Sequence, residues 1–206
     1  MAAFTGENLT CIRGDRLVFE GVDFAVESGG ALVLTGPNGS GKSSLLRLMA
    51  GLGRPAVGRL AWDSVDVDDG DEEHGARHAY LGHADAVKPQ LTVAENLDFW
   101  AAFRLGPVAA ADAVRAALAA LAIEHLAEVP GRYLSAGQRR RVNLARVIAL
   151  RPRLWLLDEP TTALDRETVG RFEGVLDGAR ADGAMVVLST HTDLAVAGAE
   201  VLELGA

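Results

Sequence analysis

The sequence is poor in cysteine and lysine, and it has no long apolar run. Cys11 is the single cysteine among 206 residues, which excludes a disulfide framework and fits a reducing compartment. The 20 basic residues include only two lysines, Lys42 and Lys88. Residues 1–15 are too polar for a signal peptide, and no apolar run approaches the roughly 18 residues of a membrane span. We therefore expect a soluble protein whose membrane role, if it has one, requires another subunit.

The net charge of −8 argues against a general nucleic-acid surface, which needs a basic face. Apolar residues make up 49% of the chain, which is enough for a sizeable core. The length suits one domain with, at most, a small appended lobe.

One of the two lysines lies in a glycine-rich loop, GPNGSGKS, over residues 36–43. The loop follows an apolar run typical of a buried strand and opens a predicted helix. Its glycines let backbone N–H groups face phosphates, and the helix N-terminus adds positive partial charge. Lys42 is expected to neutralise the β- and γ-phosphates, and Ser43 to ligate Mg²⁺. The expected nucleotide-binding residues of this loop are Gly36, Pro37, Asn38, Gly39, Ser40, Gly41, Lys42, Ser43 and Ser44.

Two adjacent acids, Asp158 and Glu159, follow a second apolar strand pattern at residues 154–157. Ligands of open α/β sheets bind at the carboxyl ends of the strands, so these acids are expected to face the nucleotide. Asp158 would hold Mg²⁺, directly or through water, and Glu159 would orient and deprotonate the attacking water.

Between these motifs lies LSAGQ, residues 134–138, which allows two interpretations. Ser135 and Gln138 have the spacing of a capping box, so the serine could simply cap its own helix. Gly137 is unfavourable in a first turn unless something approaches closely, and the arginines 139–141 oppose the helix dipole. An anion bound at this helix end would explain both features.

The three motifs in this order resemble the ATP-binding-cassette (ABC) ATPases, which hydrolyse ATP as a facing pair. The resemblance implies that Ser135, Gly137 and Gln138 contact the γ-phosphate held by the partner. It also implies that Asp165, in Ala-Leu-Asp, crosses the dimer interface and that His191, after a strand, contacts the γ-phosphate as a catalytic residue.

Two positions depart from the general ABC pattern. His83 stands where a glutamine is usual, after the strand that precedes the helical lobe, and its titration would add pH sensitivity. Arg13 is nearest to the usual adenine-stacking aromatic residue; a guanidinium can stack on a base, although a plain surface arginine is an equal alternative.

The expected fold is α/β, a P-loop NTPase core with a mainly parallel sheet, an N-terminal antiparallel β region and an inserted helical lobe. We expect one ABC domain over 1–206, with 1–84 and 135–206 forming the β region and core and 85–134 the lobe. Predicted strands cover 8–13, 17–26, 31–35, 154–157, 185–189 and 201–204. Predicted helices cover 42–50, 92–104, 109–121, 125–127 and 135–150.

The acidic stretch 63–73 fails the spacing of a calcium loop and is expected to be a solvated loop. Three histidines (His74, His78 and His83) could suggest a metal or haem site, but we expect surface or loop residues.

The short length, the segments 11–16 and 80–83, and LTVAENL at 91–97 resemble the ATP-binding subunits of cytochrome c maturation haem exporters. The resemblance implies an ATP-sandwiched homodimer on the cytoplasmic face of the inner membrane, bound to a CcmB-like integral membrane subunit and to haem-handling assembly proteins. Phe99, Trp100 and Phe103 could line a groove for a helix of that subunit. The alternatives are a cassette for another exported substrate and a soluble ABC ATPase acting on ribosomes or DNA.

Overall fold

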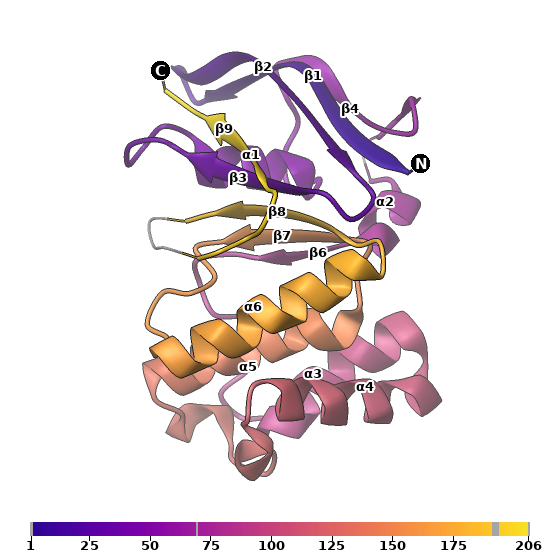
Figure 1. The fold of residues 1–206 in the computed structure, drawn as a ribbon, viewed down its shortest axis with the longest axis vertical. Helices are drawn as coiled ribbons and strands as arrows, with labels where there is room; N and C mark the ends of the chain where they lie inside the picture. The colour runs from indigo at the N-terminus through magenta and orange to yellow at the C-terminus, as the bar shows by residue number, and fades with distance from the viewer. Residues whose placement is uncertain (1, 69, 191–193, 206) are drawn as a thin grey trace.

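The computed structural model describes residues 2–68, 70–190 and 194–205, and its centre is a five-stranded parallel sheet (Figure 1). The strand order is β6-β7-β8-β3-β9, and every neighbouring pair is parallel. The central strands are continuous apolar runs because both faces of the sheet are covered. The strands are β3 (Ala31–Thr35), β6 (His78–Leu81), β7 (Leu154–Asp158), β8 (Met185–Ser189) and β9 (Glu200–Glu203).

A second, antiparallel sheet has the order β2-β1-β4-β5 and contains the long N-terminal hairpin. Its strands are β1 (Ala3–Arg13), β2 (Arg16–Glu27), β4 (Val57–Trp62) and β5 (Val65–Asp66). The predicted antiparallel region is therefore confirmed, although its first two strands begin earlier than expected.

Two apolar cores lie on opposite faces of the parallel sheet. Helix α1 (Lys42–Met49) fills the space between the two sheets with buried leucines. Helices α5 (Ala136–Leu150) and α6 (Arg166–Ala181) cover the other face. Together the two sheets and these layers confirm the expected fold class.

The segment between β6 and α5 is helical and packs on α5. Thr92 caps its first helix with the predicted box, which Glu95 completes. The division of the chain at 85–134 stays a prediction. The helical elements here are α3 (Val93–Leu105), α4 (Pro107–Ala120) and two short 3₁₀ turns, η1 (Glu124–Leu126) and η2 (Gly131–Tyr133).

The acidic stretch 63–73 is not simply a solvated loop, because it contributes β5 and the start of α2 (Glu72–Arg77), which Asp71 caps. His74 is not a surface residue either, since only 3% of it is exposed. Its Nδ1 accepts from Trp62 Nε1 at 3.0 Å, and its Nε2 donates to Met49 O at 2.8 Å. The histidine thus pairs two buried polar groups between the sheets, and burial lowers its pKa.

Candidate nucleotide site

The glycine loop joins the end of β3 to the start of α1, as its sequence predicted. Gly36 and Gly41 have φ of 128° and 108°, where an L side chain is strained. A Cβ on Gly36 would lie 2.2 Å from the carbonyl oxygen of Leu204, and one on Gly41 would lie 2.8 Å from Phe19. Only glycine therefore fits this path of the backbone.

Lys42 and Ser43 begin α1 and lie at the carboxyl end of the parallel sheet. Lys42 is 6% exposed, and its Nζ donates to Gly36 O at 2.7 Å and Pro37 O at 3.0 Å. An ammonium has three donors, so one remains for a phosphate. Ser43 Oγ donates to Asp158 Oδ1 at 3.0 Å, which joins the loop to the end of β7.

Glu159 follows β7 in a left-handed conformation, with φ of 47°. Its backbone N–H donates to Ser189 O and to Ser189 Oγ, each at 3.1 Å. Ser189 Oγ also donates to Asp158 Oδ1 at 2.8 Å, so one serine at the end of β8 holds both acids.

A cleft opens beside this loop, and Glu159 lies on its wall with residues of α1. Arg13 lines the cleft, as does Arg16, which the sequence analysis did not single out. None of the described residues that line it is aromatic. The lining comprises Arg13, Arg16, Val18, Asn38, Gly39, Gly41, Lys42, Ser43, Ser44 and Glu159.

The N-terminus of α5 carries the LSAGQ segment, and its capping box is complete. Gln138 N donates to Ser135 Oγ at 3.2 Å, and Ser135 N donates to Gln138 Oε1 at 2.8 Å. Within the described residues, the N–H groups of Ala136 and Gly137 have no acceptor. A Cβ on Gly137 would lie 3.1 Å from Ala163 O, so the close approach expected there comes at least partly from this chain.

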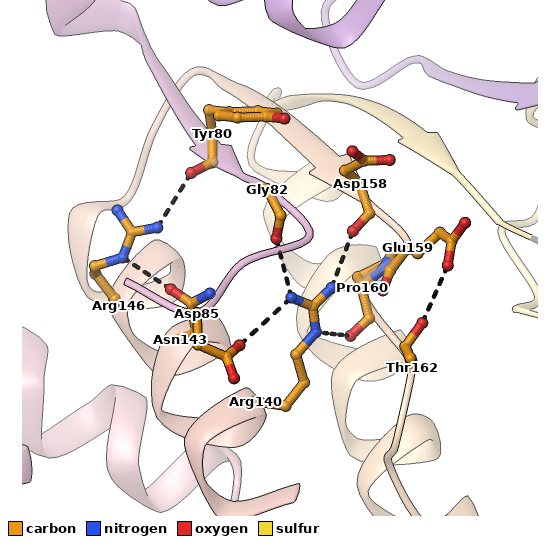
Figure 2. A network of polar contacts seen from close by, with 10 residues as sticks. All are labelled: Tyr80, Gly82, Asp85, Arg140, Asn143, Arg146, Asp158, Glu159, Pro160 and Thr162. Carbon is orange, nitrogen blue, oxygen red and sulfur yellow. Dashed lines mark hydrogen bonds and ion pairs between the residues drawn. The ribbon is translucent and has the colours of Figure 1, made fainter. Parts of the chain in front are cut away.

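Contrary to the sequence argument, not all of the arginines that follow are available to bind an anion. Arg139 donates to Leu134 O at 2.7 Å, and the guanidinium of Arg140 is directed at main-chain carbonyls (Figure 2). Sequence could not predict this, because the partners of Arg140 lie on other elements. Burial lowers the pKa of Arg140, against the raising effect of the nearby acids, of which Asp85 is the first.

The remaining expected site residues fall in three places. Asp165 is exposed and caps α6 through Thr168 N at 2.7 Å, a bond that lowers the pKa of its carboxyl. His83 is exposed after β6 and does not line the cleft. His191 lies outside the described residues.

Sequence reasoning missed Arg16, Arg140 and Ser189 as parts of the site. Ser189 ends an apolar run as Asp158 does, and that shared position at two neighbouring strand ends was a usable signal. The two arginines carried none, since each acts through the tertiary structure.

The donor set at Ser43 and Asp158 fits a hard cation. A hydroxyl and a carboxylate oxygen 3.0 Å apart are ligands that Mg²⁺ prefers. No group of three or more His, Cys, Asp or Glu side chains arranged for a metal occurs in the part of the chain that the structure describes. Within the same ranges, no helix combines the length and hydropathy that crossing a membrane requires.

The fold and this site together define an ATP-hydrolysing cassette. A family model described as ABC transporter matches residues 19–162, and the chain belongs to that family. A solved ATP-binding cassette, a dimer in a post-hydrolysis state bound to ADP and Pi, superposes with a TM-score of 0.83 at 27% identity, covering 98% of this chain and 94% of that one. A bacterial Atm1-family ABC exporter with ATP bound gives 0.84 at 25% identity, covering 98% of this chain and 36% of that one.

Among curated relatives, the similarity is higher and more particular. The cytochrome c biogenesis ATP-binding export protein CcmA of Paramagnetospirillum magneticum is 56% identical, over 98% of this chain and 94% of its own. The protein of the same name from Rhodospirillum rubrum is 55% identical, over 98% of this chain and 86% of its own. The resemblance stated from the motifs is thus confirmed.

Proposed function

We propose that two copies of this chain close around ATP and that the closed pair powers a membrane haem exporter for c-type cytochrome maturation. The observation that carries the dimer is the N-terminus of α5. The N–H groups of Ala136 and Gly137 have no acceptor in the described chain. They lie at a helix end whose dipole favours an anion. A γ-phosphate held in the partner's cleft is an anion that this end can bind.

In each site, the chain's own residues divide the work. The loop 36–44 and Lys42 bind the phosphates, and Ser43 with Asp158 would hold Mg²⁺, whose chemistry there is neutralisation of phosphate charge. Glu159 holds the attacking water and accepts its proton, a contribution of about 10²–10⁴-fold. Ser135, Gly137 and Gln138 act on the partner's nucleotide, with Asp165 at the interface and His191 as a second γ-phosphate contact.

Arg13 and His83 stand apart in this scheme. The position of Arg13 on the cleft wall supports a contact with the nucleotide base, and Arg16 lies on the same wall. His83 is exposed outside the cleft, which favours a role only after the pair has closed.

An integral membrane subunit, CcmB-like by the resemblance, would dock on the helical region. Phe99 and Phe103 of α3 are 56% and 86% exposed, whereas Trp100 packs against the core. Exposed aromatic residues on one helix suit an apolar partner helix. This arrangement would hold the cassette on the cytoplasmic face of the inner membrane, with further haem-handling assembly proteins on the membrane partner.

The choice of haem exporter over another exported substrate is supported by the two relatives named as cytochrome c biogenesis export proteins. The Atm1-family exporter shares the cassette and favours the broader alternative, a cassette that powers export of another substrate. A ribosome- or DNA-directed ATPase is the third possibility.

The test is to trap Glu159→Gln with ATP, purify it from gently solubilised membranes and identify what accompanies it. We expect ATP binding with very slow turnover and a polytopic partner together with cytochrome c assembly proteins. A different membrane protein would retain the ATPase mechanism and reject haem export. Ribosomes or DNA would reject the transporter, and normal turnover would reject Glu159 as the base.

A further inference from the structure

Arg140 connects the second turn of α5 to the loop that carries Glu159. The residue is 4% exposed. One nitrogen, Nη2, donates to Asp158 O at 2.9 Å and to Glu159 O at 2.5 Å, and Nε donates to Pro160 O at 3.2 Å. Figure 2 shows the guanidinium facing this turn of the chain. Three successive carbonyls therefore share one side chain.

The same guanidinium also holds the loop after β6. Its Nη1 donates to Gly82 O at 3.1 Å and lies 3.7 Å from a carboxylate oxygen of the partly exposed Asp85 (Figure 2). Arg140 thus joins α5, the end of β7 and the end of β6. A buried carbonyl left without a donor costs about 1–3 kcal/mol, so the folded state strongly favours this position of the Arg140 side chain.

The link bears on Glu159 because that residue is strained. A non-glycine residue at φ of 47° costs on the order of 1–3 kcal/mol and persists only where its surroundings impose it. Ser189 holds the N–H of Glu159, and Arg140 holds its carbonyl. The direction of the Glu159 carboxylate therefore depends on a side chain of α5.

We propose that Arg140 is a positioning residue for ATP hydrolysis, fixing the main chain at Glu159 and coupling it to the N-terminus of α5. The inference rests on the proposed function, in which Glu159 is the base and α5 binds the partner's nucleotide. Ser135 lies five residues before Arg140 on the same helix. Closure of the pair brings the N-terminus of α5 onto the partner's nucleotide. Through Arg140, the position of α5 then sets the position of Glu159 at the chain's own nucleotide.

The test is a double-mutant cycle of Arg140→Met with Glu159→Gln, read by steady-state ATP turnover of the full chain, alone and with its co-purified membrane partner. Arg140→Met should lower kcat about 10–100-fold and change KM for ATP less than threefold, because the phosphate-binding loop is untouched. In the Glu159→Gln background, the further loss should be less than threefold, since the group that Arg140 positions is already gone.

Arg140→Lys guards against a failure to fold and provides a graded rescue. A lysine has three donors at one point, so it can satisfy part of the carbonyl set, and its kcat should lie between those of Met and wild type. Arg146→Met is the matched control. Arg146 lies on the same helix, is largely buried and donates to Tyr80 O at 3.1 Å, without contacting residues 158–160.

The outcomes separate cleanly. Arg146→Met should lower stability and leave kcat within about threefold of wild type. An equal loss from Arg140→Met in both backgrounds, or a loss shared by Arg146→Met, would assign Arg140 a structural role only. Normal turnover of Glu159→Gln would instead overturn the proposed function, and this inference with it.

Discussion

Helices α3 and α5 begin with the same local structure and use it differently. Thr92 and Ser135 both have φ of −66° and ψ of 167°, and both are completed by a side chain three residues on. At α3, the next N–H groups, of Val93 and Ala94, donate to carbonyls of the segment 127–129 at 3.1 and 2.9 Å. At α5, the equivalent groups have no acceptor among the described residues.

The difference shows that a capping motif fixes where a helix starts but not what its free donors serve. In either case the capping box satisfies two of the four N-terminal N–H groups, that of the cap residue and that of the residue three positions on. At α3, carbonyls of the same chain accept from the two remaining N–H groups, so that helix end has a structural role. The corresponding donors of α5 remain available to a ligand or partner.

The largest expected effect comes from an acid placed at the start of α5. Ala136 is exposed, and Ala136→Glu puts a carboxylate where the helix dipole favours it, raising the free energy of unfolding by about 0.3–1 kcal/mol. The same carboxylate would face the partner's phosphates, so ATP-driven dimerisation should weaken roughly 100-fold. Size-exclusion chromatography of the Glu159→Gln protein with Mg-ATP measures this, and chemical denaturation measures stability.

Ala136→Gln controls for size without charge and should dimerise within a few-fold of its parent. Should Ala136→Glu dimerise normally, the α5 end would be no more functional than that of α3, and the comparison would fail.

Local structure could be predicted from the sequence, whereas contacts between distant residues could not. Residues 31–35 were predicted with correct bounds, because a continuous apolar run between polar turns has one stable place, inside a sheet. The boxes at Thr92 and Ser135 were equally readable, since capping is local. The role of the arginines after Ser135 was not, because Arg140 binds carbonyls of residues 18 to 58 positions away. His74 was wrongly predicted to be a surface or loop residue for the same reason, because its partners Trp62 and Met49 are distant in the sequence.

A second prediction separates stability of the fold from function at either helix end. Both helices are anchored to β6: Arg104 of α3 donates to His78 O, and Arg146 of α5 to Tyr80 O. The pKa of His78 is lowered to about 4, first by burial, then by His74, with Arg104 adding a smaller effect. Protonating this buried ring should therefore destabilise the fold at β6, to which both helices are anchored.

The sign follows from linkage. An unfolded histidine titrates near pH 6.5, above the folded pKa, so the unfolded state binds more protons between these values. The free energy of unfolding should be highest above about pH 6.5 and should fall by up to about 3 kcal/mol toward pH 4. Urea titrations across this range measure it. His78→Gln should flatten the profile; an unchanged slope would move the cause to His74 or to the acids.

The smallest effects come from deleting the two caps as a matched pair. Thr92→Ala and Ser135→Ala each remove one capping bond and should each cost about 1 kcal/mol of stability. Ser135→Ala should, in addition, weaken ATP-driven dimerisation roughly tenfold while leaving ATP binding by the monomer nearly unchanged, because its hydroxyl then no longer serves the partner's phosphate. Thr92→Ala should leave dimerisation intact.

Fluorescent-nucleotide binding by the monomer and chromatography of the trapped dimer measure the two quantities on the same preparations. If Ser135→Ala lost binding and dimerisation equally, or if both caps behaved alike, Ser135 would act on the fold alone. The unequal result instead assigns the extra loss to the N-terminus of α5, whose next N–H groups find no acceptor among the described residues, since the local geometry of the two caps is the same.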